Sequence, residues 1–364
     1  MVAMVQILGL PLDAAPPPAL APRAILDAPD AVLHDWLAGQ RQPPLRARQI
    51  RRWIIAGRAE SFDAMTDLPL DLRAELANSW TPLGTAIDRE QQSSDGTRKL
   101  LLRLHDGQRV ECVMIPEQDR RTACISTQVG CGMGCVFCAS GLNGVARNLS
   151  PGEILEQLIR LRNLLPTEER LTNVVVMGMG EPLANLDNLL QALAVAGRKD
   201  GLDIGARHVT ISTVGLPAKM RRLADMGKQY HLAVSLHAPN DELRNRIVPT
   251  NIRTGIADIL AAADYFFEKT GRQVTYEYVL LGGLNDGTAE ARQLAGLLRG
   301  RHAHVNLIPF NAIEGLPYRR PTADAQQDFL AALRRTGISV KVRKRKGADI
   351  DAACGQLRRK VEAG

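Results

Sequence analysis

The chain has 364 residues, of which 45% are hydrophobic and 23% charged, and its formal net charge is +7. This composition is typical of a globular protein with one large domain or two smaller ones, and no segment approaches the roughly 18 consecutive apolar residues of a membrane span. Asp13 and several prolines interrupt the apolar N-terminus, which excludes a secretory signal. We therefore expect a soluble cytoplasmic protein without membrane association, in which cysteines stay reduced.

The first part of the chain predicts a leader and a small helical domain. Residues 1–29 include a proline-rich run and predict a flexible leader. Short apolar segments at 31–37 and 50–55, separated by turns, predict a helical accessory domain over 30–95. Residues 41–58 hold six arginines and no acidic residue, a pattern that suits either binding of a polyanion such as nucleic acid or a solvated face. Alternating apolar residues then predict a hairpin linker over 96–116.

Beyond the linker, β-rich runs alternate with helical stretches. Six such strand–helix units predict an α/β fold with a parallel sheet and crossover helices, either an open sheet or a partial barrel, over 117–345. In such folds the functional loops lie beyond the carboxyl ends of the strands. The expected strands are 123–126, 173–177, 208–213, 231–236, 274–280 and 304–309, and the expected helices are 153–165, 188–196, 217–226, 256–268, 288–298 and 324–335.

The C-terminal end is strongly basic. From Arg334 onward, ten basic residues stand against three acidic ones, so this end accounts for the whole excess of positive charge. The segment 346–364 contains Cys354, which follows the basic run Lys341–Lys346. We expect this charge to attract the phosphates of a nucleic acid, and we expect neutralisation of Arg343–Lys346 to weaken that binding.

Four of the six cysteines lie within fifteen residues: Cys124 in the first expected strand of the core, and the other three in the loop after it. Cys131, Cys135 and Cys138 have the spacing C-x3-C-x2-C. A structural zinc site needs four ligands, and Cys124 could be the fourth. Three close thiolates instead leave one corner of an iron–sulfur cubane without a protein ligand, as a catalytic site requires. The spacing favours the cluster and leaves zinc as the alternative.

The spacing, with Phe137 before the last cysteine, resembles the radical S-adenosylmethionine (SAM) superfamily. Further segments resemble the adenosine-C2 RNA methyltransferases of the RlmN type, with about residues 30–358 covered in order. The resemblance implies a partial (β/α)6 barrel with a helical accessory domain, and one [4Fe–4S] cluster held by Cys131, Cys135 and Cys138. The segments begin at Arg46, Phe62, Arg147, Gly178, Ser235, Asn306 and Asp349.

The resemblance also implies the reaction. Carbon 2 of adenine is electron-poor and cannot attack a sulfonium methyl, so a radical route is required. Cys354 takes a methyl group from one SAM, and a radical made from a second SAM abstracts hydrogen from that methyl. The resulting carbon radical adds to adenine, which leaves a covalent protein–RNA adduct. Cys124 releases the product by forming a transient disulfide with Cys354, and Glu111 accepts the proton lost from carbon 2.

The same resemblance assigns the cofactor contacts and partners. Contacts to SAM are expected from Gly180, Glu181, Ser212, Ser235, Leu236, His237 and Asn311. The implied substrates are 23S ribosomal RNA at the peptidyl-transferase centre and tRNA beside the anticodon. The expected electron donor is a protein such as flavodoxin, and the chain is expected to be a monomer. Methylation at carbon 8, as in the Cfr-type relatives, stays open, as does a zinc-stabilised RNA-binding protein without catalysis.

Overall fold

The computed structural model describes residues 23–357. Most of the expected leader and the basic residues at 358–360 therefore lie outside the described residues. Within them, no helix is long and apolar enough to cross a membrane.

A ten-stranded sheet forms the body of the described chain, in the order β14-β13-β12-β11-β10-β9-β6-β5-β4-β3. Strand β6 and strands β9 to β14 run parallel, and β3 to β6 pair antiparallel. The strands are β3 Ala86–Gln92, β4 Arg98–Arg103, β5 Arg109–Glu117, β6 Arg120–Cys124, β9 Asn173–Val176, β10 Val209–Thr213, β11 His231–Ser235, β12 Val274–Leu280, β13 Ala303–Pro309 and β14 Ser339–Val342.

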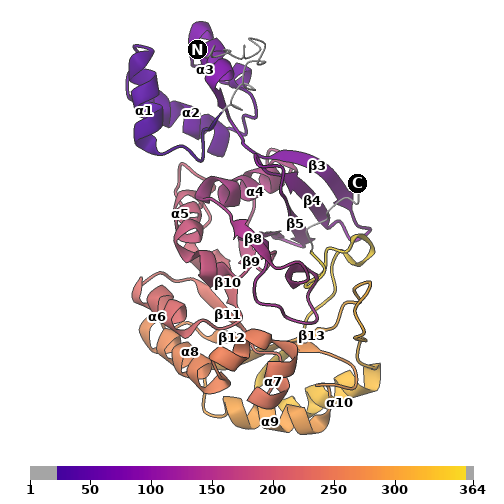
Figure 1. Ribbon diagram of the computed structural model, residues 1–364. Coiled ribbons are helices and arrows are strands. Elements are labelled where there is room, and N and C mark those ends of the chain that lie inside the picture. The colour runs from indigo at the N-terminus through magenta and orange to yellow at the C-terminus, as the bar shows by residue number, and fades with distance from the viewer. Residues whose placement is uncertain (1–22, 358–364) are drawn as a thin grey trace, which may run out of the picture.

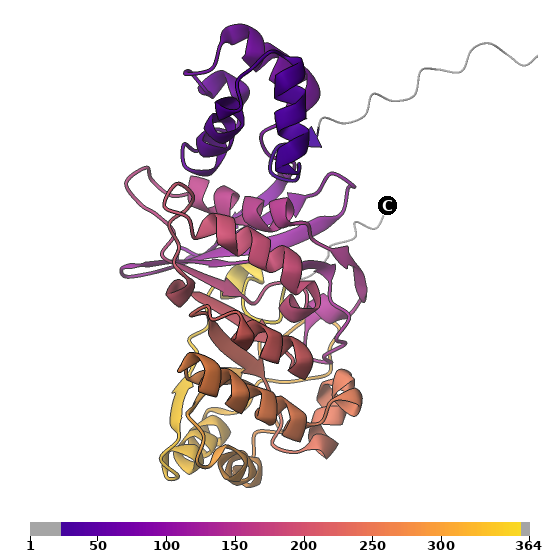
Figure 2. The same cartoon turned by 90° about the vertical axis from the view of Figure 1, so that its left-hand side faces the viewer.

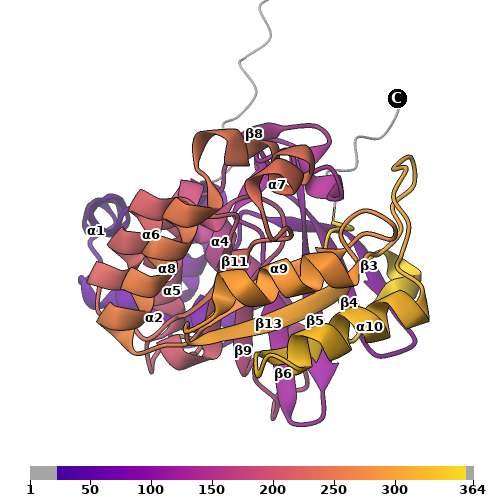
Figure 3. The ribbon, with the colours of Figure 1, turned by 90° about the horizontal axis from the view of Figure 1, so that it is seen from below.

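Helices connect the parallel strands and pack on the outside of the curved sheet (Figures 1 and 3). The six expected strand–helix units are all present, so the prediction of a partial α/β barrel with a helical accessory domain is confirmed. The helices are α4 Pro151–Asn163, α5 Leu186–Ala196, α6 Pro217–Asp225, α7 Asp241–Ile247, α8 Ile256–Thr270, α9 Thr288–Leu298 and α10 Ala323–Arg334.

The N-terminal helices form a separate layer at one end of the barrel, beside α4 and α5 (Figures 1 and 2). They are α1 Asp30–Gly39, α2 Leu45–Ile55 and α3 Leu70–Ser79. Both ends of this layer are tied together, because β1 Arg23–Ala24 pairs with β2 Trp80–Thr81. The last helix of this layer ends at Ser79. The accessory domain was expected to extend to residue 95, but residues 86–92 form β3, which pairs with β4 and so belongs to the main sheet. The expected hairpin linker is β4 and β5, and it belongs to the main sheet.

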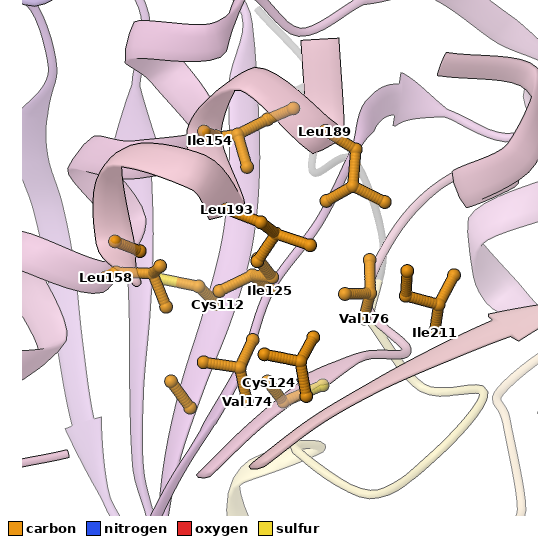
Figure 4. Packing of buried hydrophobic residues seen from close by; sticks show 14 of the residues in the cluster. Cys112, Cys124, Ile125, Ile154, Leu158, Val174, Val176, Leu189, Leu193 and Ile211 are labelled. Carbon is orange, nitrogen blue, oxygen red and sulfur yellow. The ribbon is translucent and has the colours of Figure 1, made fainter. Parts of the chain in front are cut away.

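The packing between α4 and the sheet explains where two cysteines lie. Cys112 is fully buried, and its sulfur lies beside Leu158 of α4 (Figure 4). The Cys124 sulfur points away from that group of apolar side chains. Cys124 of β6 pairs with Val113 of β5, so these two side chains lie on the same face, and the next residue along β5, Cys112, lies on the opposite face. Cys112 is therefore a core residue, whereas Cys124 faces the inside of the barrel.

Three of the six arginines at 41–58 hold the helical layer together instead of facing solvent. Arg46 donates to the Asp67 carbonyl at 3.2 Å, and Arg51 forms an ion pair with Asp30 at 3.0 Å. Arg58 donates to the carbonyls of the segment after α4, at 2.6 Å to Leu165 and 2.9 Å to Glu169. The exposed arginines of this patch are Arg41, Arg48 and Arg52.

We expect Arg58→Ala to lower the free energy of unfolding by about 1–2 kcal/mol, because partly buried carbonyls after α4 lose charge-assisted hydrogen bonds. Arg58 has a positive φ of 59°, and alanine also has a Cβ, so backbone strain stays the same. Chemical denaturation measures the loss, with Arg48→Ala as the exposed control. Equal unfolding free energies for the two variants would show that these contacts do not stabilise the domain junction.

Candidate active site

The cysteine loop is held between two short strands. Strands β7 Gln128–Gly130 and β8 Val145–Asn148 pair antiparallel, and the loop between them contains Cys131, Cys135 and Cys138. Gly130 has a φ of +80°, and a Cβ there would meet the Gly144 carbonyl oxygen at 2.0 Å. The start of the loop thus requires glycine, and the Cys131 amide donates to that same carbonyl at 2.9 Å.

The end of this loop is fixed at the start of α4. Ser150 and Glu153 form a reciprocal capping box, in which the Ser150 oxygen accepts from the Glu153 amide at 3.1 Å. Arg147 binds the Glu153 carboxylate at 2.7 and 2.8 Å and also donates to Asp106 at 2.6 Å. The sequence signal Ser-Pro-x-Glu therefore sets the direction in which the chain leaves the cysteine loop.

One cavity brings together most of the residues expected at the cofactor site. We call it the cysteine cavity. The three loop cysteines line it together with residues that follow the carboxyl ends of β9, β10, β11 and β13, where a parallel sheet places its ligands. Among its lining residues are Cys131, Cys135, Cys138, Gly180, Glu181, Ser212, Ser235, His237, Asn311 and Cys354.

Burial keeps the three loop thiols protonated when no metal is bound. Desolvation raises the pKa of Cys131 to about 12, and it also raises the pKa values of Cys135 and Cys138. A metal centre would supply the positive charge that deprotonates such thiols. Among residues 23–357, no group of three or more His, Cys, Asp or Glu side chains is arranged to hold a metal ion.

Glu181 follows β9 and is almost fully buried. Its carboxylate accepts hydrogen bonds from the Leu183 amide at 3.0 Å and from the Val214 amide at 2.8 Å. Burial raises its pKa, which the two amide donors partly offset. The carboxylate thereby joins the ends of β9 and β10, and its remaining lone pairs can accept from a ligand ammonium in the cavity.

His237 follows β11 and is a neutral side chain at this site. Burial lowers its pKa to about 3, with a further contribution from Arg244. Its Nδ1 accepts from the Val279 amide at 3.1 Å, so the ring proton is on Nε2. The ring also packs edge-on against Phe137 of the cysteine loop, with centroids 4.8 Å apart. His237 thus connects the end of β11 to the cysteine loop.

Asn311 offers an unpaired acceptor to the cavity. Its Nδ2 donates to the Cys354 carbonyl at 3.1 Å, whereas its Oδ1 is buried without a hydrogen-bond partner among the described residues. A buried acceptor without a partner costs free energy. A ligand with an N–H or O–H group would satisfy it, so the side chain fits a nucleoside or amino-acid group of SAM.

The segment around Cys354 is docked against both the sheet and the cysteine loop. The Gly355 carbonyl accepts from the Ala139 amide at 2.8 Å, and the Leu357 carbonyl accepts from Ser140 Oγ at 2.6 Å. On the other side, Asp349 binds Ser93 in the turn between β3 and β4. These contacts hold Cys354 at the wall of the cysteine cavity.

Cys124 is outside the lining of the cysteine cavity but within range of the charge of Cys354. Both are free thiols in this structure. Burial raises the pKa of Cys124 to about 12, followed in size by the charge of Cys354, while Arg343 acts in the opposite direction. The structure therefore brings together the two cysteines that the sequence places 230 positions apart.

Glu111 and Leu236 do not line the cavity. Glu111 is buried and forms an ion pair with Lys99 at 3.0 Å, and Lys99 also donates to the Asp351 carbonyl at 3.3 Å. Leu236 is fully buried in the apolar core, and its carbonyl accepts from Arg244 at 2.9 Å. The geometry thus connects Glu111 to the Cys354 segment through Lys99, and it places Leu236 behind the site.

A second cavity adjoins the first, with a volume of about 380 Å³. We call it the basic cavity, since its wall includes Arg320, Lys341, Arg343, Lys344, Arg345 and Lys346. Residues common to the two cavities include Met177, Glu277, Asn311, Arg343 and Cys354. Cys354 therefore lies where a cavity suited to a polyanion meets the cysteine cavity.

Sequence reasoning did not predict Arg244 or Glu277. Arg244 is fully buried and donates to the carbonyls of Leu236 and Ser235, at 2.9 and 3.1 Å, and to that of Val214. It thereby supports the ends of β10 and β11. Neither residue has a sequence signal of its own, because each acquires its partners from strands or loops distant in the chain.

Comparison with known proteins decides the family. Residues 125–295 match the Radical SAM superfamily model, and residues 24–81 match the ribosomal RNA large subunit methyltransferase N-terminal domain. A probable dual-specificity RNA methyltransferase RlmN from Rhodopirellula baltica is 56% identical over 327 residues, which cover 90% of this chain and 88% of that protein. This chain belongs to the RlmN family of radical SAM methyltransferases.

Other RlmN proteins and one solved structure agree. The probable dual-specificity RNA methyltransferase RlmN of Bacillus subtilis is 44% identical, with 90% of this chain and 91% of that protein covered. The crystal structure of a radical SAM methyltransferase from Sphaerobacter thermophilus matches with a TM-score of 0.88 and 45% identity, over 93% of this chain and 99% of that one. The prediction of a radical SAM RNA methyltransferase is confirmed, and the non-catalytic RNA-binding alternative is not supported.

Proposed function

We propose that the protein methylates carbon 2 of adenosine in 23S ribosomal RNA, at the peptidyl-transferase centre, and in tRNA beside the anticodon. The observation that carries the proposal is the position of Cys354 at the junction of the cysteine cavity and the basic cavity, where its charge also acts on Cys124. The names of the RlmN relatives support dual specificity for RNA.

The superfamily implies a [4Fe–4S] cluster and SAM. We assign the cluster to Cys131, Cys135 and Cys138, whose three sulfurs leave one iron open to SAM. When bound, the cluster supplies the electron that cleaves SAM reductively. Glu181 and Asn311 fit the polar groups of SAM, because each has acceptor capacity directed to the same cavity. Gly180, Ser212, Ser235 and His237 complete this wall, and Leu236 supports it from the core.

Three side chains perform the chemistry of the chain itself. The Cys354 thiolate attacks the methyl carbon of one SAM, which forms the S–C bond and releases neutral S-adenosylhomocysteine. After the methylene radical has added to adenine, Glu111 takes the proton from carbon 2, and the cluster would take back the unpaired electron of the adduct. The Cys124 thiolate then attacks the Cys354 sulfur, which forms the disulfide and leaves the electron pair on the carbon attached to RNA. Protonation of that carbon gives the methyl group.

Basic surfaces supply the affinity for RNA. Lys344 and Arg345 are exposed at the mouth of the basic cavity, and Arg48 and Arg52 are exposed on the N-terminal helical layer. Two separated basic surfaces suit a folded RNA that spans both parts of the protein. We further propose a monomer in the cytoplasm that receives electrons from a flavodoxin-type donor.

The test is anaerobic reconstitution with iron and sulfide, followed by reaction with SAM and with unmodified ribosomal RNA or tRNA. Mass spectrometry of the nucleosides should identify 2-methyladenosine in both RNAs. Formation of 8-methyladenosine would assign the protein to the Cfr-type reaction instead. Cluster-containing protein that cleaves SAM but leaves both RNAs unmethylated would overturn the proposal.

A further inference from the structure

Arg343 lies inside the site, although its neighbours in the basic run face solvent. It follows β14, and its amide donates to the Leu307 carbonyl of β13 at 2.8 Å, which fixes the backbone. Its side chain is partly buried and lines both cavities, whereas Lys344 and Arg345 are exposed. Its Nη1 lies 3.5 Å from the Met177 sulfur. The guanidinium is therefore directed into the barrel.

Glu277, Arg343 and Cys354 line both cavities, and Glu117 also lines the basic cavity. The pKa of Arg343 is raised, mainly by the charge of Cys354, and further by Glu277 and Cys124. Burial alone would lower it. The guanidinium thus gains more from its anionic neighbours, which also include Glu117, than it loses by leaving water.

Glu277 keeps this cation balanced through the reaction. It is 4% exposed in the middle of β12, and Asn306 of β13 donates to its Oε2 at 2.8 Å. Methylation turns the Cys354 sulfur into a neutral thioether, which removes one negative charge from beside Arg343. The fixed Glu277 carboxylate remains, so the guanidinium is not left as an uncompensated buried charge.

We propose that Arg343 is a positioning residue for the sulfur chemistry: it holds Cys354 and Cys124 beside one guanidinium and stabilises each attacking thiolate in turn. This inference rests on the proposed function. In the first step the Cys354 thiolate, whose proton has gone to solvent, forms the S–C bond. The S–CH3 bond of SAM breaks, and S-adenosylhomocysteine leaves with that electron pair. In the second step the Cys124 thiolate forms the S–S bond, and the electron pair of the broken S–C bond goes to the RNA carbon. This role replaces the expectation that Arg343 binds an RNA phosphate.

The test compares Arg343→Met and Arg343→Lys with Arg334→Met, which removes a guanidinium from the exposed end of α10. Intact-protein mass spectrometry follows single-turnover methylation of Cys354 by SAM in the reconstituted enzyme. We expect Arg343→Met to slow methylation at least about tenfold, Arg343→Lys to recover most of that loss, and Arg334→Met to match the wild type.

Two further measurements distinguish stabilisation of the thiolates by Arg343 from two alternatives, a contact to RNA phosphate and simple packing of the side chain. The dissociation constant for tRNA should stay within about twofold of the wild type for Arg343→Met, because no phosphate contact is lost. Alkylation of Cys354 by iodoacetamide should slow in Arg343→Met and recover in Arg343→Lys. Normal methylation with weakened RNA binding would overturn the inference, and so would equal losses in both variants. Absence of Cys354 methylation in the wild type would instead contradict the proposed function.

Discussion

Cys354→Ala is expected to lower RNA methylation at least about a thousandfold, because no other sulfur at the junction of the two cavities can accept and transfer the methyl group. The loop cysteines are the other thiols of the cysteine cavity, and we assign them to the cluster. RNA affinity should stay unchanged, since the thiol adds no charge contact to phosphate. Incorporation of labelled methyl from SAM into tRNA measures the first effect, and equilibrium RNA binding measures the second.

Cys124→Ala should have a different result. Methyl transfer to Cys354 and attachment to adenine remain, but the release step lacks its thiol, so covalent protein–RNA adduct should accumulate. A denaturing gel detects the adduct by the altered mobility of the RNA. Cys112→Ala is the matched control, since Cys112 is also buried but packs against α4. It should lower stability by about 1–2 kcal/mol and give no adduct. Normal product release by Cys124→Ala would contradict its assigned role.

Gly180→Ala is expected to disable the cofactor site. Gly180 has a φ of +103°, and a Cβ there would meet the Gln128 amide nitrogen at 2.8 Å and the Gln128 Cβ at 2.7 Å. Gln128 lies in β7, and its Oε1 accepts from the Glu181 amide at 2.8 Å. The added methyl must therefore displace either the strand that begins the cysteine loop or the turn that presents Glu181. We expect a loss of about 2–4 kcal/mol in unfolding free energy and no SAM cleavage.

Gly107→Ala is the control that separates the backbone strain of a positive φ from the steric clash of an added Cβ. Gly107 also has a positive φ, +79°, but a Cβ there meets nothing within 4 Å. The free energy of unfolding of this variant should fall by only about 1 kcal/mol, and SAM cleavage should remain, because the variant adds backbone strain but no steric clash. Thermal denaturation and production of 5′-deoxyadenosine are the two measurements. Wild-type cleavage by Gly180→Ala would show that the turn tolerates the displacement.

The strand–helix units could be predicted because their signal is local. Apolar periodicity and turn residues occur within each unit, and the crossover rule then orders the strands in one sheet. Strands β3 and β14 were not predicted, since their residues are largely polar and exposed or partly exposed. Their strand character depends on pairing with β4 and β13, which are formed elsewhere in the chain.

Arginines show the limit of sequence reasoning most directly. Arg48, Arg58 and Arg343 all belong to basic runs and cannot be distinguished by composition. In the structure Arg48 is exposed, Arg58 binds carbonyls after α4, and Arg343 lines the same two cavities as Cys354. A long flexible side chain with five donors takes its role from the acceptors that surround it.

The sequence by itself determined the family, the fold class and the set of cysteines, because motif residues and periodic patterns are properties of neighbouring positions. The excess of positive charge was also visible in the sequence. Which of the basic residues lie on the surface and which lie in the active site was not. Only the tertiary structure placed Cys124 beside Cys354, joined the two cavities at that sulfur and turned Arg343 inward. Those relations arise from strand pairing and from the docking of residues 347–357, which bring together groups that are far apart in the chain.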